Sequence, residues 1–316
     1  MSIYSIVSDS TIRWDLSNCF KNRTLEQKFL YHWKWAKLYY DYKDNKDILM
    51  KDNNKDIDIF SFWMKNCFIK DSSITLISLW CWNSSVEKEI YTNLPENYNI
   101  DYVWVDLSKE MLRLSEENLK EIDVNKKFVC ADFSSIEFKN EVHNITKANQ
   151  KKVFSFFSNT FWNINHTNII DTLYDILDSW EQIWLDVRLR KSNKIKDDMD
   201  IFNLVNIDDD DTILQEFLSN TFIWNDIPKE NWYISKVMSK EEWINSLKIK
   251  FNFNFSKKTK INMKWQITFL PGETVRCLQI YYYDSESLIN FFEEHNFKLI
   301  DKEIEWLRWQ FLFEKK

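Results

Sequence analysis

Three short segments of this chain combine residue types that could hold a nucleoside, and each follows an apolar run. The first spans residues 76–83 and reads Leu-Ile-Ser-Leu-Trp-Cys-Trp-Asn. This pattern is typical of a strand that ends in a Gly-x-Gly turn, where bare backbone lets a ligand approach closely. Tryptophan stands at both glycine positions, Trp80 and Trp82. If these positions are bare backbone, we expect Trp80, Cys81 and Trp82 to form a cofactor-binding turn.

Acidic residues end the next two apolar runs. Asp106 lies at the end of the second run, roughly 25 residues beyond the first turn, where a carboxylate can accept hydrogen bonds from both hydroxyls of a ribose. The alternative for Asp106 is a helix-capping or turn aspartate. Asp132 and Phe133 end the third run. An acid followed by an aromatic residue can hold the amino group of adenine and cover its ring, so the three segments together predict a nucleoside site.

The elements that must position these residues alternate between strands and helices. We expect strands at 74–79, 98–107, 127–133, 152–158 and 181–189, and helices at 84–94, 108–122 and 168–177. A strand, a crossover helix and the next parallel strand form the repeating unit of doubly wound folds. The predicted fold class is therefore α/β, with a Rossmann-like parallel sheet.

The alternation stops after residue 190, which indicates a second, α+β lobe. Strands are expected at 251–255 and 261–270, a helix at 284–295 and two closing strands within 297–313. The first 55 residues are expected to be helical. The predicted organisation is a helical part of a substrate lobe (1–55), a cofactor domain (56–190), the rest of the substrate lobe (191–283) and a return to the cofactor domain (284–316).

Composition and charge exclude several classes of protein. A net charge of -7 and a pI near 5.3 argue against nonspecific nucleic-acid binding. No apolar run approaches the roughly 20 residues of a membrane span, and no signal peptide is evident. The odd number of cysteines and the absence of a Cys-x-x-Cys pair suit reduced thiols in a cytoplasm, and four scattered histidines predict no structural metal. We expect a cytoplasmic monomer.

Glycine and tryptophan occur in abnormal numbers. The chain has 1 Gly and 16 Trp in 316 residues, whereas glycine normally makes up about 7% of a globular protein. One hypothesis is that UGA codons, printed here as tryptophan, are decoded as glycine in the source. AT-rich coding also depletes glycine, but it does not add tryptophan, whose ordinary codon is UGG. The alternative is a protein that is truly rich in tryptophan.

Three longer segments resemble the histidine-specific methyltransferase family, whose members trimethylate the α-amine of histidine in ergothioneine synthesis. Residues 156–163 resemble its F-L-G-S-T-I-G-N segment, residues 28–35 its K-x-F-Y-D-x-x-G segment, and residues 270–283 its G-E-T-I-x-T-E-x-S-x-K-Y segment. The resemblance extends from about residue 26 to 313 and is weakest between 191 and 260. The positions where related sequences have glycine or a small residue include Trp35, Trp80, Trp82, Trp104 and Trp162, and Trp180 stands where a turn glycine is expected.

The resemblance implies a class I methyltransferase that uses S-adenosyl-L-methionine. Asp106 would bind the ribose hydroxyls, and Asp132 and Phe133 would frame the adenine. In the same way, Asn163 would bind the substrate carboxylate, and Tyr31 would line the amino-acid pocket.

The chain departs from the family at the residues that recognise the imidazole. Leu278 and Ile280 replace a glutamate and a serine that contact the histidine side chain, and Val86 replaces a cofactor-contacting lysine. Because an unpaired buried imidazole is costly, we expect an amino acid or amine less polar than histidine. No second pocket tyrosine is recognisable between residues 191 and 240.

No catalytic acid or base is assigned, because methyl transfer from a sulfonium mainly requires a neutral amine held near the methyl carbon. His166 is expected to be a surface or first-turn helix residue rather than a base. Residues 281–283, three tyrosines, are expected to pack in a strand rather than to form a cage for a methylated amine.

Two other functions fit part of the pattern. If the tryptophans are real, their indoles would fill the cofactor cleft, and the chain would be a noncatalytic binding protein on a methyltransferase fold. A dinucleotide-dependent oxidoreductase shares the Gly-x-Gly turn and the strand-end acid, but the third glycine of G-x-G-x-x-G is missing here. The favoured function is methyl transfer to an amino acid or similar small amine.

Overall fold

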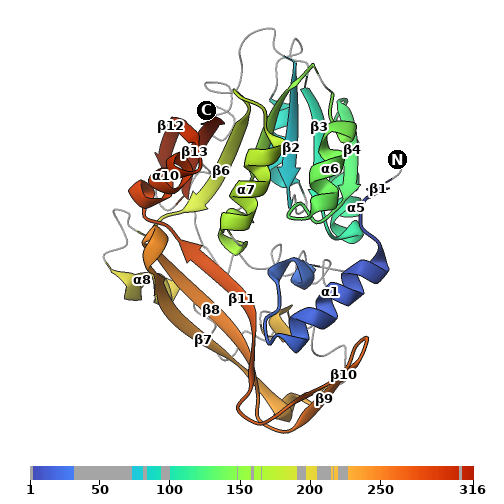
Figure 1. The fold of residues 1–316 in the computed structure, drawn as a ribbon, viewed down its shortest axis with the longest axis vertical. Coiled ribbons are helices and arrows are strands. Elements are labelled where there is room, and N and C mark those ends of the chain that lie inside the picture. Colours follow the sequence, from blue (N-terminus) through green and yellow to red (C-terminus); the bar gives the residue numbers. More distant parts are fainter. Residues whose placement is uncertain are drawn as a thin grey trace.

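The computed structural model describes residues 3–31, 73–80, 84–93, 100–147, 149–157, 160–164, 166–190, 197–204, 215, 217–219, 227–305 and 308–316. Within these residues the chain forms a large sheet flanked by helices and, beside it, a lobe of long antiparallel strands (Figure 1). The α/β class with a second, α+β lobe is therefore confirmed.

The large sheet has eight strands in the order β1-β4-β3-β2-β5-β6-β13-β12. The first six in this order pair in parallel, while β13 is antiparallel to both β6 and β12. Their bounds along the chain are β1 (Tyr4–Ser5), β2 (Ile74–Leu79), β3 (Ile100–Asp106), β4 (Asn125–Cys130), β5 (Lys151–Phe156), β6 (Gln182–Arg188), β12 (Phe297–Glu305) and β13 (Arg308–Lys315).

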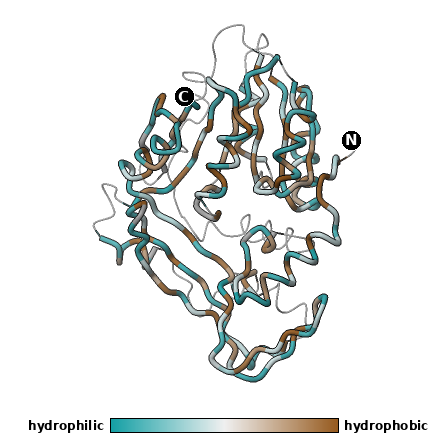
Figure 2. The backbone as a smooth tube through the Cα atoms, in the orientation of Figure 1, coloured by the Kyte–Doolittle hydropathy of each residue, from teal (hydrophilic) through white to brown (hydrophobic). Residues whose placement is uncertain are grey.

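The central strands are buried on both faces. Every residue of β2, β3 and β6 is buried, as expected for parallel strands covered by helices on both sides. Alternate side chains enter different cores: Ile77 and Val103 belong to one cluster, and Leu76 and Tyr102 to the other. The strands of the large sheet are accordingly brown over much of their length in Figure 2.

Helices cover both faces of this sheet. Buried residues of α6 (Ile136–Ile145), α7 (His166–Ile176) and α10 (Ser285–Glu294) belong to the first cluster, and those of α4 (Ser85–Thr92) belong to the second. The helix α5 (Lys109–Asn118) contributes to both clusters.

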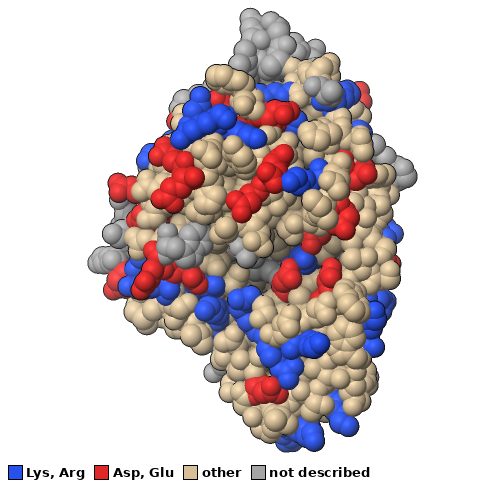
Figure 3. Space-filling model, in the orientation of Figure 1, with Lys and Arg blue, Asp and Glu red and all other residues tan. Residues whose placement is uncertain are grey.

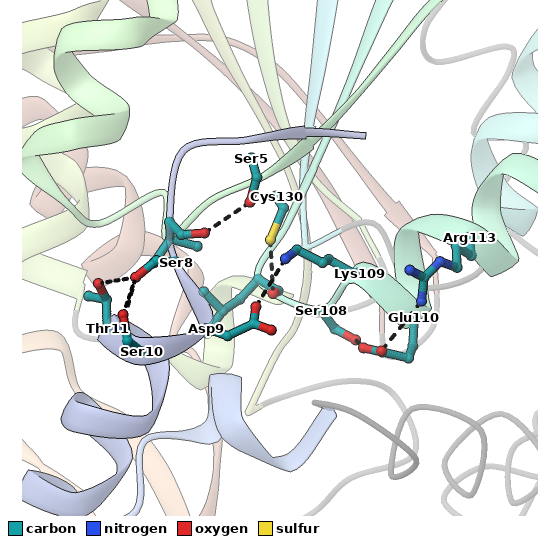
Figure 4. Close-up of polar contacts among 12 residues, drawn as sticks. Ser5, Ser8, Asp9, Ser10, Thr11, Ser108, Lys109, Glu110, Arg113 and Cys130 are labelled. Atoms are coloured by element: carbon teal, nitrogen blue, oxygen red, sulfur yellow. Dashed lines mark hydrogen bonds and ion pairs between the residues drawn. The ribbon is translucent and has the colours of Figure 1, made fainter. Parts of the chain in front are cut away.

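A short N-terminal segment closes one edge of the sheet. Strand β1 pairs with Val129 and Cys130 of β4, and the chain then enters α1 (Asp9–Lys21), whose N-cap Ser8 accepts a hydrogen bond from the Thr11 backbone. In Figure 4, Asp9 of α1 and Lys109 of α5 point toward each other, with 3.0 Å between carboxylate and ammonium. The prediction that the first 55 residues are helical is thus incomplete: α1 and η1 (Gln27–Tyr31) are helical, β1 is a strand, and residues 32–55 lie outside the described part.

The second lobe contains a three-stranded antiparallel sheet of β7 (Trp232–Glu241), β8 (Ser246–Phe255) and β11 (Thr274–Tyr282), together with a hairpin of β9 (Thr259–Asn262) and β10 (Gln266–Phe269). Short helical segments, α8 (Asp198–Leu204), η3 (Lys229–Asn231) and η4 (Glu242–Ile244), also belong to it. The prediction of a single strand at 261–270 was wrong. Residues 263–265 form a turn, so this region is a hairpin of β9 and β10.

The lobe enters and leaves the cofactor domain at one point. Leu189, after β6, forms a parallel bridge with Tyr283, after β11. The Arg190 N–H donates to the Tyr283 carbonyl at 2.7 Å, and the Tyr283 N–H donates to the Arg188 carbonyl at 3.0 Å. The lobe is therefore an insertion whose two ends lie side by side.

Candidate functional site

The strand order reverses beside β2. From β2 the chain continues through β3 and β4 on one side, and β5 and β6 extend the sheet on the other. Ligands of doubly wound sheets bind at the carboxyl ends of the strands at such a switch point. A cavity of about 320 Å³ lies there, lined by Leu25, Glu26, Lys28, Trp80, Asp106, Leu107, Ala131, Asp132, Phe133, Ser134, Ile164, Asn168, Ile169, Arg276, Leu278 and Gln279.

This cavity brings together residues that the sequence places on separate strands. Trp80 follows β2, Asp106 ends β3, Asp132 and Phe133 follow β4, and Leu278 comes from β11 of the second lobe. The cavity therefore joins the nucleoside-binding edge to the second lobe.

The other predicted site residues are placed differently. The backbones of Tyr31 and Asn163 end η1 and η2 (Thr160–Asn163). Ile280 is buried in the core and does not line the cavity. Cys81 and Trp82 lie outside the described residues.

Asp106 presents an unpaired carboxylate oxygen at the cavity. Its Oδ1 accepts a hydrogen bond from the Ser108 backbone at 2.8 Å, whereas its Oδ2 is buried and has no hydrogen-bond partner. Burial raises the pKa of Asp106 to about 7, and Glu110 adds to this rise, while the backbone N–H groups of Ser108 and Leu107 oppose it. A buried acceptor without a partner is unfavourable unless a ligand donates to it.

Asp132 is held by an ion pair with the N-terminal segment of the chain. The Lys28 ammonium of η1 lies 2.6 Å from Asp132 and 2.7 Å from Glu26. Burial would raise the pKa of Asp132, but Lys28 and the hydrogen bonds donated by Ser134 lower it below its ordinary value. Burial would likewise lower the pKa of Lys28, but Asp132 and Glu26 outweigh burial and raise it. Asp132 therefore stays ionised at the cavity.

The backbone at Trp80 is in the left-handed region, with φ of 61°. This conformation favours glycine, and a bulky residue in it is an outlier. The indole lines the cavity 6.2 Å, centroid to centroid, from Phe133. The backbone N–H of Trp80 donates a hydrogen bond to the Val105 carbonyl at 2.8 Å, so the turn is held against the neighbouring strand β3.

The segment after β5 packs against this turn. The hydroxyl of Thr160 in η2 donates to the Phe157 carbonyl at 2.7 Å and lies 3.5 Å from the Trp80 carbonyl. Asn163 ends this short helix. The backbone that carries the predicted carboxylate binder is thus adjacent to the predicted cofactor turn.

His166 is a core residue. It begins α7, which confirms the expectation of a first-turn helix residue, and with 2% exposure it is buried rather than at the surface. Its Nε2 lies 2.5 Å from the Tyr283 hydroxyl, and its ring contacts Tyr281. The three tyrosines 281–283 are buried, and the prediction that they pack in a strand is confirmed. His166 does not line the cavity.

The burial of His166 predicts a pH dependence of stability. Burial lowers its pKa to about 3, and Lys248 lowers it further, so the folded state keeps the imidazole neutral while the unfolded chain binds a proton below about pH 6.5. This stability is present above pH 6.5 and is lost as the pH falls toward 3. Relative to His166→Gln, we expect the wild type to lose roughly 2 kcal/mol of unfolding free energy between pH 8 and pH 5.

Urea unfolding at several pH values measures this difference. His143→Gln, on the exposed side of α6, is the matched control and should follow the wild type. Equal pH slopes for the wild type and His166→Gln would contradict the prediction.

The N-terminal segment and the second lobe contribute cavity residues that the sequence did not single out. Lys28 begins the segment 28–35, which was noted only for its resemblance, and Glu26 precedes it. Arg276 and Gln279 occupy variable positions within 270–283. Val86 lies on α4 and packs against the second core cluster, away from the cavity.

Other kinds of site are absent from the described residues. No cluster of three or more His, Cys, Asp or Glu side chains suitable for a metal occurs among them. Within the same part of the chain, no helix combines the length and apolar character that a membrane crossing requires. The face in Figure 3 carries acidic side chains on both lobes and no unbroken basic surface.

Comparisons with known proteins identify a family. The model of a family described as histidine-specific, SAM-dependent methyltransferases matches residues 12–305. No curated protein matches the sequence.

Several solved structures are similar to this chain at low sequence identity. An S-adenosylmethionine-dependent methyltransferase from Clostridium acetobutylicum is 13% identical, with 88% of this chain and 98% of that chain covered and a TM-score of 0.46. A Pyrococcus horikoshii protein is 12% identical, with coverage of 87% and 99% and a TM-score of 0.46. A SAM-dependent methyltransferase from Methanosarcina mazei is 10% identical, with coverage of 82% and 99% and a TM-score of 0.44.

Proposed function

Because this chain belongs to the family of histidine-specific, SAM-dependent methyltransferases, we propose that its methyl acceptor is an amino acid or similar small amine, methylated on nitrogen. The observation that carries this proposal is the shared cavity. Its nucleoside edge holds Asp106 and Asp132, and its opposite wall comes from Arg276, Leu278 and Gln279 of the inserted lobe. A cofactor and an acceptor can therefore meet in one space.

The residues of the nucleoside edge fit S-adenosylmethionine. The buried, unpaired Oδ2 of Asp106 would accept hydrogen bonds from the ribose, and Asp132 and Phe133 would frame the adenine. When bound, the cofactor would supply a methyl group attached to a sulfonium. The neutral thioether that remains is a good leaving group. The protein's task is to bring a neutral amine up to that methyl carbon and to exclude water. Transfer would convert the cofactor to the thioether S-adenosylhomocysteine and the amine to its methylated form, with one proton released to solvent.

The loss of the polar residues that contact the imidazole in the family favours an acceptor other than histidine. Leu278 lines the cavity, and it is one of the two apolar replacements. A leucine side chain cannot pair with a buried imidazole N–H, and leaving that group unpaired costs about 1–3 kcal/mol. An aliphatic group would instead pack on it.

We also infer that glycine stands at the printed tryptophans encoded by UGA. The single printed glycine, Gly272, has φ of 87°, and Trp80 and Trp180 share this left-handed region with φ of 61° and 76°. Trp104 is fully buried, its indole N–H has no partner, and its ring centroid lies 3.5 Å from that of Tyr102. Glycine would relieve both backbone strain and crowding.

Two experiments test these proposals. Peptide mapping of the native polypeptide by mass spectrometry should find glycine at the peptides that contain positions 80, 104 and 180. Protein made with that decoding should form S-adenosylhomocysteine and a methylated product with at least one amine in a panel of amino acids. Tight cofactor binding without product from any amine would overturn the amine-acceptor proposal, and tryptophan at these positions would overturn the decoding.

A further inference from the structure

The cavity wall supplied by β11 holds polar groups that have no partner. Arg276 and Gln279 are both half-buried and both line the cavity. No hydrogen bond or ion pair joins the Arg276 guanidinium to another described residue, and the Oε1 of Gln279 is a buried acceptor without a partner. Such groups are unfavourable unless a ligand completes them.

A β-bulge places these two side chains on the same face. Arg276 lies opposite Asn252 and Gln279 lies opposite Lys250, and the register shifts at Cys277 between them. Because Asn252 and Lys250 are two residues apart on β8, they point to the same side of the sheet, and so do their partners. Without the extra residue, Arg276 and Gln279 would point to opposite faces. Bulges of this kind re-aim side chains beside binding sites.

The same face carries excess positive charge. Lys250, opposite Gln279, is half-buried, and no ion pair joins it to another described residue. Burial lowers the pKa of Lys250, and Lys248 and Arg276 lower it further, while Glu241 opposes this shift. Lys248 is already paired with Glu241 at 2.7 Å. Arg276 and Lys250 are therefore neighbouring cations that lack an anion of their own, in a chain whose net charge is -7.

The acidic residues of the cavity either form ion pairs with Lys28 or lie at the opposite end of the cavity from Arg276. Glu26 is paired with Lys28, which also holds Asp132. Asp106 ends β3 in the cofactor domain, and its Oδ2 has no partner, so it does not neutralise the guanidinium. An anion that enters the cavity would complete the Arg276 site.

We propose that the methyl acceptor presents a carboxylate to Arg276 and a hydrogen-bond donor to Gln279. This inference rests on the proposed function and assigns Arg276 and Gln279 as residues that determine acceptor specificity. The planar guanidinium can bind a carboxylate through two parallel hydrogen bonds, and such charge-assisted bonds are the stronger kind.

Pairs of acceptors that differ by one charge test the inference. Glutamate against glutamine, and aspartate against asparagine, vary a side-chain carboxylate, while leucine against leucinamide varies the α-carboxylate. In at least one pair we expect kcat/KM to favour the charged member by about 10- to 100-fold. In Arg276→Gln this preference should disappear, with the Kd for S-adenosylmethionine unchanged.

Further variants separate recognition from folding. Arg276→Lys keeps the positive charge but loses the planar guanidinium that can form two parallel hydrogen bonds. Part of the preference for the charged acceptor should therefore remain. Arg113→Gln, on the exposed side of α5, is the matched control and should behave as the wild type. An equal preference in the wild type and Arg276→Gln, or no preference in any pair, would overturn the inference while methyl transfer itself persists. Cofactor binding without transfer to any acceptor would instead overturn the proposed function together with this inference.

Discussion

Asp106→Asn is expected to weaken S-adenosylmethionine binding by roughly 100-fold or more, because hydrogen bonds to a charged group contribute about 1.5–3 kcal/mol each and a ribose offers two hydroxyls. The same substitution is expected to stabilise the cofactor-free protein at neutral pH. Burial raises the pKa of Asp106 from its ordinary value of 3.8 to about 7, so this group lowers stability progressively as the pH rises from about 4 to about 7. Asparagine removes that penalty. Calorimetric Kd values and unfolding free energies should thus move in opposite directions.

The pH dependence of binding gives a second readout for Asp106. If the ionised carboxylate accepts hydrogen bonds from both ribose hydroxyls as proposed, the affinity of the wild type should rise as the pH rises through about 7. The affinity of Asp106→Asn should not show this rise. An Asp106→Asn protein that binds the cofactor as tightly as the wild type would remove Asp106 from the site.

Asp101, at the start of the same strand, provides the matched control. It pairs with Lys147 and accepts a hydrogen bond from Asn125 at 2.9 Å. Although burial would raise the pKa of Asp101, these partners lower it. Asp101→Asn should leave cofactor affinity unchanged and should lower stability slightly at neutral pH, the reverse of Asp106→Asn.

Trp80→Gly, introduced into the chain as printed, is expected to increase cofactor affinity by at least 10- to 100-fold. The substitution removes an indole from the cavity wall and relieves a left-handed residue with φ of 61°, a strain of about 1–2 kcal/mol. Calorimetry with S-adenosylmethionine measures the change. A loss of affinity on this substitution would show that the indole belongs to the binding site.

Trp180→Gly separates the effect of backbone strain from the effect of removing an indole from the cavity. Trp180 has φ of 76° and is 69% exposed, and it does not line the cavity. Glycine at position 180 should therefore raise the free energy of unfolding by about 1–2 kcal/mol, as expected from the relief of backbone strain, without changing cofactor affinity. Equal effects of the two substitutions on affinity would contradict an occluding role for Trp80.

The cofactor edge could be predicted from the sequence because its residues are local to strand ends. In a parallel sheet the carboxyl ends of β2, β3 and β4 meet at one edge, so Trp80, Asp106 and Asp132 had to converge once the strands were recognised. Their apolar runs are continuous because both faces of these strands are buried.

The second lobe was less predictable because its pattern is not periodic. Strand β7 alternates poorly between buried and half-buried residues and was not expected. The bulge at Cys277 reverses the alternation of β11, so no two-residue period connects Arg276 with Gln279. The pairing of Lys28 with Asp132 joins residues that are distant in the chain and depends on how η1 meets the sheet edge.

The adjoining ends of the inserted lobe have a consequence for how acceptor specificity can change. Because Leu189 and Tyr283 form a bridge, grafting a different insert between them need not separate β6 from α10. The entropy of joining such close anchor points depends only weakly on the length of the graft. An inserted lobe of another length can therefore be accommodated between residues 189 and 283 while Asp106 and Asp132, which lie outside it, keep their places.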